Sequence, residues 1–168
     1  MKKYYAIAAL VLIFSAATLP NRDVAAMEYE SVQFTYQKCL KASAASQEIV
    51  AALTSKYHTY DLGDTGVHEM YQEIYDSAQQ LLYMLPEMND DVAAALQQSG
   101  MTNVEIKTLI NNRNGIIAIL IGLLTESGAG MTTNGNYTAT DDLYKWRKDI
   151  EDGFKPVEKK LDEMLSCF

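Results

Sequence analysis

The chain contains few of the residues that most functional motifs require. Of its 168 residues, two are cysteine, two are histidine and three are proline. Two cysteines permit a single internal disulfide, which excludes the dense disulfide framework of many small secreted proteins. The sequence has no glycine-rich phosphate loop, no Cys-x-x-Cys pair and no His-Glu-x-x-His motif. We therefore expect no catalytic activity, no metal ion and no cofactor.

Basic residues are scarce in the middle of the chain. The formal net charge is −8, and residues 57–142 carry twelve acidic side chains against only Lys107 and Arg113. Nucleic acids and anionic membranes both require a basic footprint, so this balance argues against either as a partner. It is compatible with a partner protein that presents a basic surface, and equally with acidity that keeps the chain soluble.

The N-terminal apolar run is too short to anchor the chain in a membrane. Residues 6–14 are apolar, about half of the ~20 residues needed to cross a bilayer. Lys2 and Lys3 precede the run and small residues follow it, a pattern typical of a cleavable export signal. Cleavage after Ala17 or after Ala26 fits, and we favour Ala26. This predicts a signal peptide over residues 1–26, one mature domain over residues 27–168, a secreted or periplasmic location and no membrane insertion.

Alternating strand patterns are nearly absent, and helical spacing of apolar residues recurs along the mature chain. The spacing predicts helices over residues 29–57, from about 65 to Pro86, over 90–98, from about 102 to 126, and from 140 to the C-terminus. Gly153 and Pro156 break or kink the last helix. We expect an all-α fold, a compact bundle of four to five helices stapled by one disulfide.

One helix of this bundle is unusually apolar. Residues 116–124 are apolar apart from Gly122, which predicts that the helix lies buried at the centre of the bundle. After it, residues 127–139 contain three glycines and no charged side chain, so we expect a long loop there.

The two cysteines lie near the two ends of the mature chain. A disulfide between Cys39 and Cys167 closes a loop of roughly 130 residues, worth about 4–5 kcal/mol in the chain-entropy treatment. We interpret the pair as a staple between the first and last helices. An intermolecular disulfide is an alternative, whereas a redox-active pair lacks the spacing that lowers a thiol pKa.

Several polar residues are candidates for contact with a partner protein. The acids between Asp61 and Asp91 supply long-range attraction to a basic surface, and exposed aromatic side chains supply the fixed contacts. The glycine-containing loop is a further candidate for a binding role. These candidates are Asp61, Asp64, Asp90, Asp91, Asn134 and Tyr137. Asn136 begins a glycosylation sequon that matters in a eukaryotic source. His58, Asp61, Asp64, His68 and Glu69 match no metal-binding spacing, and we interpret them as loop and capping residues.

The second helix carries adaptable side chains that suit either a core or a ligand pocket. Methionine fills irregular spaces, and tyrosine combines an apolar ring with a polar tip. A pocket for an apolar or amine ligand would use Met70, Tyr71, Tyr75, Tyr83 and Met84. In the last helix, Trp146 lies on the apolar stripe, and we interpret the surrounding charged residues as a solvated face.

The chain resembles the small all-helical secreted proteins of mosquito saliva, the anophensin/albicin group. The features that carry the resemblance are the export signal, the acidic mature chain, the helical pattern and the C-terminal Ser166-Cys167-Phe168, pairable with Cys39. The resemblance implies a monomeric, non-enzymatic salivary immunomodulator that binds and inhibits a complement, contact-pathway or immune component of the host. A carrier of a small apolar or amine ligand and a bacterial periplasmic binding protein remain as alternatives.

Overall fold

The computed structural model describes residues 19–56, 64–132 and 139–168, with side chains from residues 32–56, 66–132 and 141–168. Every element in this part of the chain is helical, which confirms the all-α prediction. The elements are α2 (Leu19–Lys56), α3 (Asp64–Met84), α4 (Asp90–Gln98), α5 (Asn103–Thr132), α6 (Ala139–Lys148), the π-helix η2 (Asp149–Phe154) and α7 (Lys155–Leu165).

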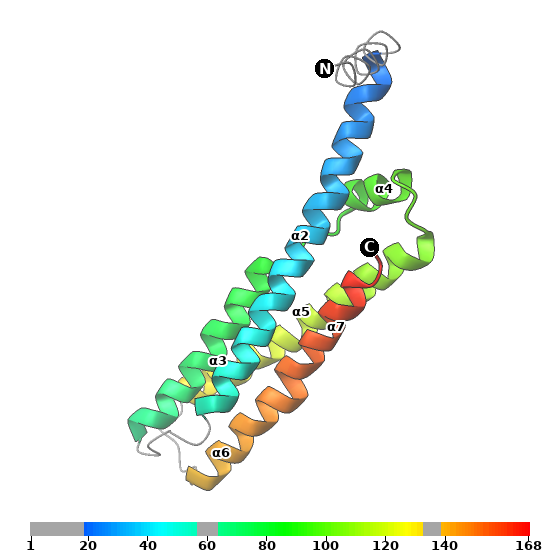
Figure 1. Cartoon of the computed structure of the whole chain (residues 1–168). Coiled ribbons are helices and arrows are strands. Elements are labelled where there is room, and N and C mark those ends of the chain that lie inside the picture. Colours follow the sequence, from blue (N-terminus) through cyan, green and yellow to red (C-terminus); the bar gives the residue numbers. More distant parts are fainter. Residues whose placement is uncertain (1–18, 57–63, 133–138) are drawn as a thin grey trace, which may run out of the picture.

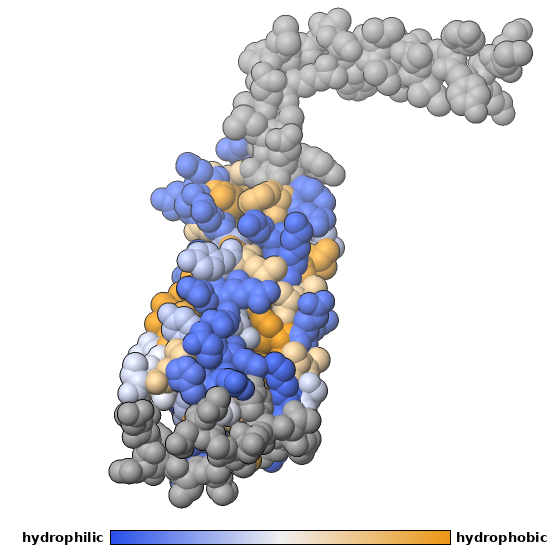
Figure 2. All heavy atoms as spheres, turned by 90° about the vertical axis from the view of Figure 1, so that its left-hand side faces the viewer, coloured by the Kyte–Doolittle hydropathy of each residue, from blue (hydrophilic) through white to orange (hydrophobic). Residues whose placement is uncertain are grey.

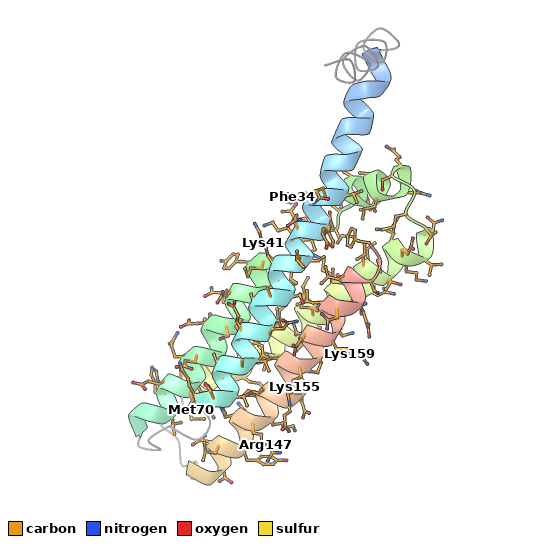
Figure 3. The ribbon with its side chains drawn as sticks, viewed as in Figure 1. Phe34, Lys41, Met70, Arg147, Lys155 and Lys159 are labelled. Atoms are coloured by element: carbon orange, nitrogen blue, oxygen red, sulfur yellow. The ribbon has the colours of Figure 1, made fainter. Side chains whose placement is uncertain are left out.

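Four long rods form the bundle, and the last of them consists of α6, η2 and α7 in succession (Figure 1). Helices α2 and α5 are each flanked by α3 and α7, so α2 and α5 lie on opposite corners. The short α4 lies across the upper end and packs against α2 and α5. In Figure 3, Met70 of α3 and Arg147 of α6 mark the lower end, where the last rod begins.

Helix boundaries follow the capping residues of the sequence. The Asn89 side chain accepts a hydrogen bond of 2.9 Å from the Val92 amide at the start of α4. Gly100 adopts φ +100 after that helix, a conformation that glycine tolerates and other residues rarely adopt. Thr102 and Glu105 form the predicted capping box, with bonds of 2.7 Å from the Thr102 amide and 3.3 Å from the Glu105 amide.

The core is a continuous layer of aliphatic and aromatic side chains between the four rods. Its fully buried members include Leu53, Ile74, Leu81, Leu96, Leu109, Ile116, Leu120, Phe154, Leu161 and Met164. Small buried residues of α2, among them Ala42 and Ser46, leave space for the neighbouring helices. Ser43 donates a hydrogen bond of 3.2 Å to the Asp162 carboxylate, which ties α2 to α7.

Two predicted boundaries differ from the structure. Helix α2 begins at Leu19, ten residues before the expected start, and runs without a break through the favoured cleavage position after Ala26. Helix α5 continues to Thr132 instead of ending near residue 126. Gly130 lies within this extension and allows α5 to pack closely on α3, since a Cβ there would lie 2.6 Å from the Tyr71 ring.

The prediction that α5 is buried on all sides is wrong. Only one stripe of the helix faces the core, because each rod of a four-cornered bundle contacts neighbours on one side. Ile121 is 51% exposed, and Val104 and Ala118 also face outward. Among the described helices, α5 is long and apolar enough by length and composition to cross a membrane. Its most apolar 18-residue stretch has a mean hydropathy of 1.5, and 22% of that stretch is buried. Here it packs against α3 and α7 as a bundle helix.

Candidate functional site

A π-helical segment interrupts the last rod and creates the least regular part of the core. Pro156 has no amide hydrogen to donate to the carbonyl of Asp152, so the ordinary helical pattern cannot continue through this point. The Lys155 amide instead donates to the carbonyl of Ile150, five residues earlier. Such wide turns occur often at functional sites. The sequence predicted the interruption at Gly153 and Pro156, and the structure confirms its position.

Asp149, the first residue of η2, is a buried carboxylate. Its exposed fraction is 7%, and its Oδ2 atom has no hydrogen-bond partner among the described residues. Burial raises the pKa of Asp149 to about 6, while the positive charges of Lys145 and Lys148 oppose the rise and Glu126 and Asp152 add to it. The side chain is therefore charged at neutral pH in a site that does not fully satisfy it. The sequence interpretation of Asp149 as part of a solvated face is wrong.

A second buried carboxylate, that of Asp142, lies seven residues before Asp149, about two helical turns away. The Tyr71 hydroxyl of α3 donates a hydrogen bond of 3.0 Å to the Oδ1 atom of Asp142. Lys145 lies over the Tyr71 ring, 5.0 Å from its centroid, and its Nζ is 3.7 Å from the Glu126 carboxylate of α5. This polar group joins three helices at the lower end of the bundle.

The space enclosed beside this polar group is very small. Its volume is about 10 Å³, and it is lined by Val67, Met70, Tyr71, Ile74, Asp142, Trp146 and Asp149. A single water needs roughly 10–15 Å³, so the cavity holds one water at most and no organic ligand.

A larger, open groove lies on the surface between α5 and the last rod. Its volume is about 400 Å³. The α5 side consists of Ala118, Ile119, Gly122, Leu123 and Glu126, and the opposite side of Tyr144, Lys145, Lys148, Asp149, Asp152 and Gly153. Asp149 lines both this groove and the enclosed cavity. Asp149 therefore lies between the groove and the small cavity.

Two glycines shape the groove in different ways. A Cβ on Gly122 would have no heavy atom within 4 Å, so this position opens directly into the groove. A Cβ on Gly153 would lie 3.0 Å from the Leu123 side chain, so glycine there permits η2 to approach α5. Gly122 leaves space for the groove, whereas Gly153 allows η2 to pack closely against α5.

The predicted acidic residues do not form one patch. Asp90 and Asp91 are exposed in the first turn of α4 at the upper end, whereas Asp64 begins α3 at the lower end (Figure 1). The 21 residues of α3 separate these ends by about 30 Å. The other candidates, Asp61, Asn134, Asn136, Tyr137 and His58, lie outside the described residues. His68 and Glu69 are exposed on α3. Figure 2 shows one face of the molecule, on which hydrophilic side chains are interspersed with hydrophobic ones.

The predicted pocket residues of α3 point in different directions. Met70 and Tyr71 are buried and line the enclosed cavity. Tyr75 and Met84 are half-buried, and Tyr83 is 78% exposed. The five residues therefore do not surround a common cavity, because α3 turns only one stripe toward the core.

The two cysteines lie in the same seam between α2 and α7, but no disulfide joins them. The Tyr36 ring, one turn before Cys39, packs at 5.5 Å against the ring of Phe168, the neighbour of Cys167. Burial raises the pKa of the Cys39 thiol to about 11, and the charge of Cys167 adds to the rise. Burial also raises the pKa of Cys167, with a further contribution from Glu105. The staple is thus absent from the structure, although α2, which carries Cys39, is in contact with α7, which ends two residues before Cys167.

Sequence reasoning missed the two buried carboxylates, although a signal for them was present. Asp142, Trp146 and Asp149 follow one another at intervals of four and three residues, which places all three on one face of a helix. Because Trp146 was assigned to the core, the acids at these intervals also belong to the buried side. Comparison with protein-family models, with curated proteins and with solved structures finds no match to this chain.

Proposed function

We propose that the chain is an exported, non-enzymatic protein that acts by binding another protein. The observation that carries the proposal is the tight packing of the described core: the cavity beside Tyr71 has a volume of about 10 Å³. This packing favours recognition of a partner on the surface. Exposed aromatic side chains there supply suitable anchors, since aromatic residues are enriched among the strongest interface contacts. They include Phe34 and Tyr83.

The partner in this proposal is a host protein, a component of complement, of the contact pathway or of another immune system, and the chain acts as a monomeric salivary immunomodulator. Inhibition follows from occlusion of the partner's surface and needs no catalytic group. The acidic charge of the chain favours a partner with a basic surface, because complementary charge accelerates association.

Export is part of the same proposal, with residues 1–26 as the signal peptide. The first part of α2 projects beyond the other helices in Figure 1. The described core contacts of α2 begin only with Val32 and Thr35. Removal of residues through Ala26 thus shortens α2 and leaves the described core intact. N-terminal sequencing of secreted protein tests this: a mature chain that begins at Met27 supports it, and a retained Met1 contradicts it.

We also propose that oxidation after export joins Cys39 to Cys167. Support comes from the shared seam, where the Tyr36–Phe168 ring contact and the Ser43–Asp162 hydrogen bond lie on either side of Cys39. The raised pKa of Cys39 keeps its thiol protonated at neutral pH, which suits a structural cysteine better than a reactive one.

Capture of proteins from vertebrate plasma on the immobilised mature chain tests protein binding. We expect saturable retention of a complement or contact-pathway component. Retention should fall when Phe34 and Tyr83 are both replaced by Ser, because the aromatic anchors are lost. The matched control is Gln79→Ser, which alters an exposed polar residue of α3. Absence of any saturable plasma partner contradicts the proposal.

A further inference from the structure

We propose that the groove between α5 and η2 binds a small organic amine, with Asp149 as the counter-ion of its ammonium group. This site is separate from the protein-binding surface proposed above and does not depend on it. The occupant is a free molecule that carries one cationic nitrogen on an apolar group.

The polar requirement of the groove comes from Asp149. Its side chain is more than nine-tenths buried, lines the groove, and leaves Oδ2 without a hydrogen-bond partner among the described residues. A buried polar atom without a partner is uncommon in folded proteins and calls for an explanation such as a ligand. An ammonium group bound beside Asp149 neutralises the buried charge of this carboxylate.

The surrounding charges favour a cation over an anion. Asp149, Asp152 and Glu126 supply three carboxylates to the groove, against Lys145 and Lys148. Lys145 is already held by the Glu126 carboxylate at 3.7 Å and lies over the Tyr71 ring at 5.0 Å. The described residues contain no group of three or more His, Cys, Asp or Glu placed to hold a metal ion.

The apolar requirement comes from the floor of the groove. Ile119, Gly122 and Leu123 of α5 lie there, and Tyr144, 70% exposed, stands on the opposite side. The apolar side chains suit a hydrocarbon or aromatic group attached to the nitrogen. The ring of Tyr144 can in addition attract the cationic nitrogen itself. The volume of about 400 Å³ falls within the usual 300–1,000 Å³ of small-molecule sites.

Isothermal titration with phenethylamine tests the site on the purified protein. We expect one saturable site with a dissociation constant below about 1 mM, since so small a ligand makes few contacts. Phenylethanol has the same size without the charge, and we expect it to bind at least about ten-fold more weakly. Equal binding of the two compounds, or no saturable binding of phenethylamine, overturns the proposal.

Three variants locate the site. Asp149→Asn removes the charge with little change in shape and should weaken phenethylamine about ten- to hundred-fold. Gly122→Leu fills the groove from a position with open space and should abolish binding. Asp90→Asn removes the same charge from exposed α4 and should leave binding unchanged. Unchanged affinity in Asp149→Asn overturns the assignment, and circular dichroism of each variant checks that it is folded.

A final comparison separates a free amine from a side chain of a partner protein. N-acetyl-lysine methylamide presents an ammonium group on a peptide backbone. Weaker binding of this probe than of phenethylamine supports a free amine as the occupant. Tighter binding overturns that assignment in favour of a partner's lysine. If wild type and Gly122→Leu retain a plasma partner equally, that partner binds a surface other than the groove, and the two proposals are tested separately.

Discussion

Asp149 is the residue on which the candidate site depends. An unpaired carboxylate in a buried position opposes folding, because its charge interacts less favourably there than with water. Proteins place such groups most often where a ligand or a reaction uses them. Asp149 lines the groove in which we propose such a ligand.

Replacement of Asp149 by Asn should stabilise the free protein at neutral pH. The folded pKa of about 6 lies above the ordinary value of 3.8, so the folded chain gains stability as the pH falls from above 6 toward 4. The variant lacks this titration. We expect it to be more stable by about 1–2 kcal/mol above pH 7, with the difference lost near pH 4. Urea unfolding at several pH values measures this.

The control for this prediction is Asp152→Asn, which alters an exposed carboxylate three residues away on the same element. Its stability should follow the wild-type curve closely. A pH-independent difference between wild type and Asp149→Asn would show that the effect comes from packing instead of from the buried charge.

The hydrogen bond from Tyr71 to Asp142 makes a separate contribution to the stability of the fold. Tyr71→Phe leaves a buried carboxylate without this donor, so we expect a loss of about 1–2 kcal/mol in the free energy of unfolding. Tyr144→Phe removes a hydroxyl from an exposed side chain and should cost little. Equal losses in the two variants, measured by chemical unfolding, would argue against a stabilising role for the buried bond.

At the scale of elements, the groove depends on how η2 approaches α5. Gly153 contributes because a side chain there would displace Leu123, whereas Gly122 faces open space. The two glycines therefore have opposite roles although both lie within helices.

Alanine at these two positions should have opposite effects on stability. Gly122→Ala should stabilise the protein by about 0.5–1 kcal/mol, since alanine favours helix and meets no neighbour. Gly153→Ala should destabilise it, because the new Cβ lies 3.0 Å from Leu123. Thermal unfolding compares the two variants directly. Stabilisation by both would mean that η2 and α5 are farther apart than described.

Local sequence signals were sufficient to predict several elements. Asn89 and the pair Thr102 and Glu105 mark helix starts because their side chains satisfy free amides locally. The exposure of α5 could not be predicted in this way, because it depends on how many neighbours surround the helix. For the same reason, the exposure of Tyr83 could not be predicted: its helical spacing is that of a pocket residue, but its side chain faces solvent.

The candidate site was predicted less well than the helices. Its walls come from residues 118–126 and 144–153, which adjoin only after the rods have packed. No local pattern specifies how deeply Asp149 is buried. Trp146 indicated the correct face, but the acids at its helical spacing were interpreted by their charge.

At the scale of the whole molecule, the proposed disulfide links the first and last rods. Oxidised protein should be more stable than reduced protein by about 2–4 kcal/mol, because the bond restricts the unfolded chain. Cys39→Ser should remove this dependence on reducing agent and remain helical. Thermal unfolding with and without a reductant measures the difference. Two free thiols in secreted protein, detected by mass spectrometry, would contradict the staple.

The packing of the described core and the open groove both fit the proposal that partners are recognised on the surface. The carboxylate of Asp149, which is buried and has an oxygen without a hydrogen-bond partner among the described residues, lines that groove. The most direct test is an NMR titration that follows the carboxyl carbon of Asp149. We predict a midpoint near pH 6 in the free protein, and a lower midpoint when phenethylamine is bound. A midpoint near the ordinary value of 3.8, unmoved by the amine, would contradict both the burial of Asp149 and its role in the groove.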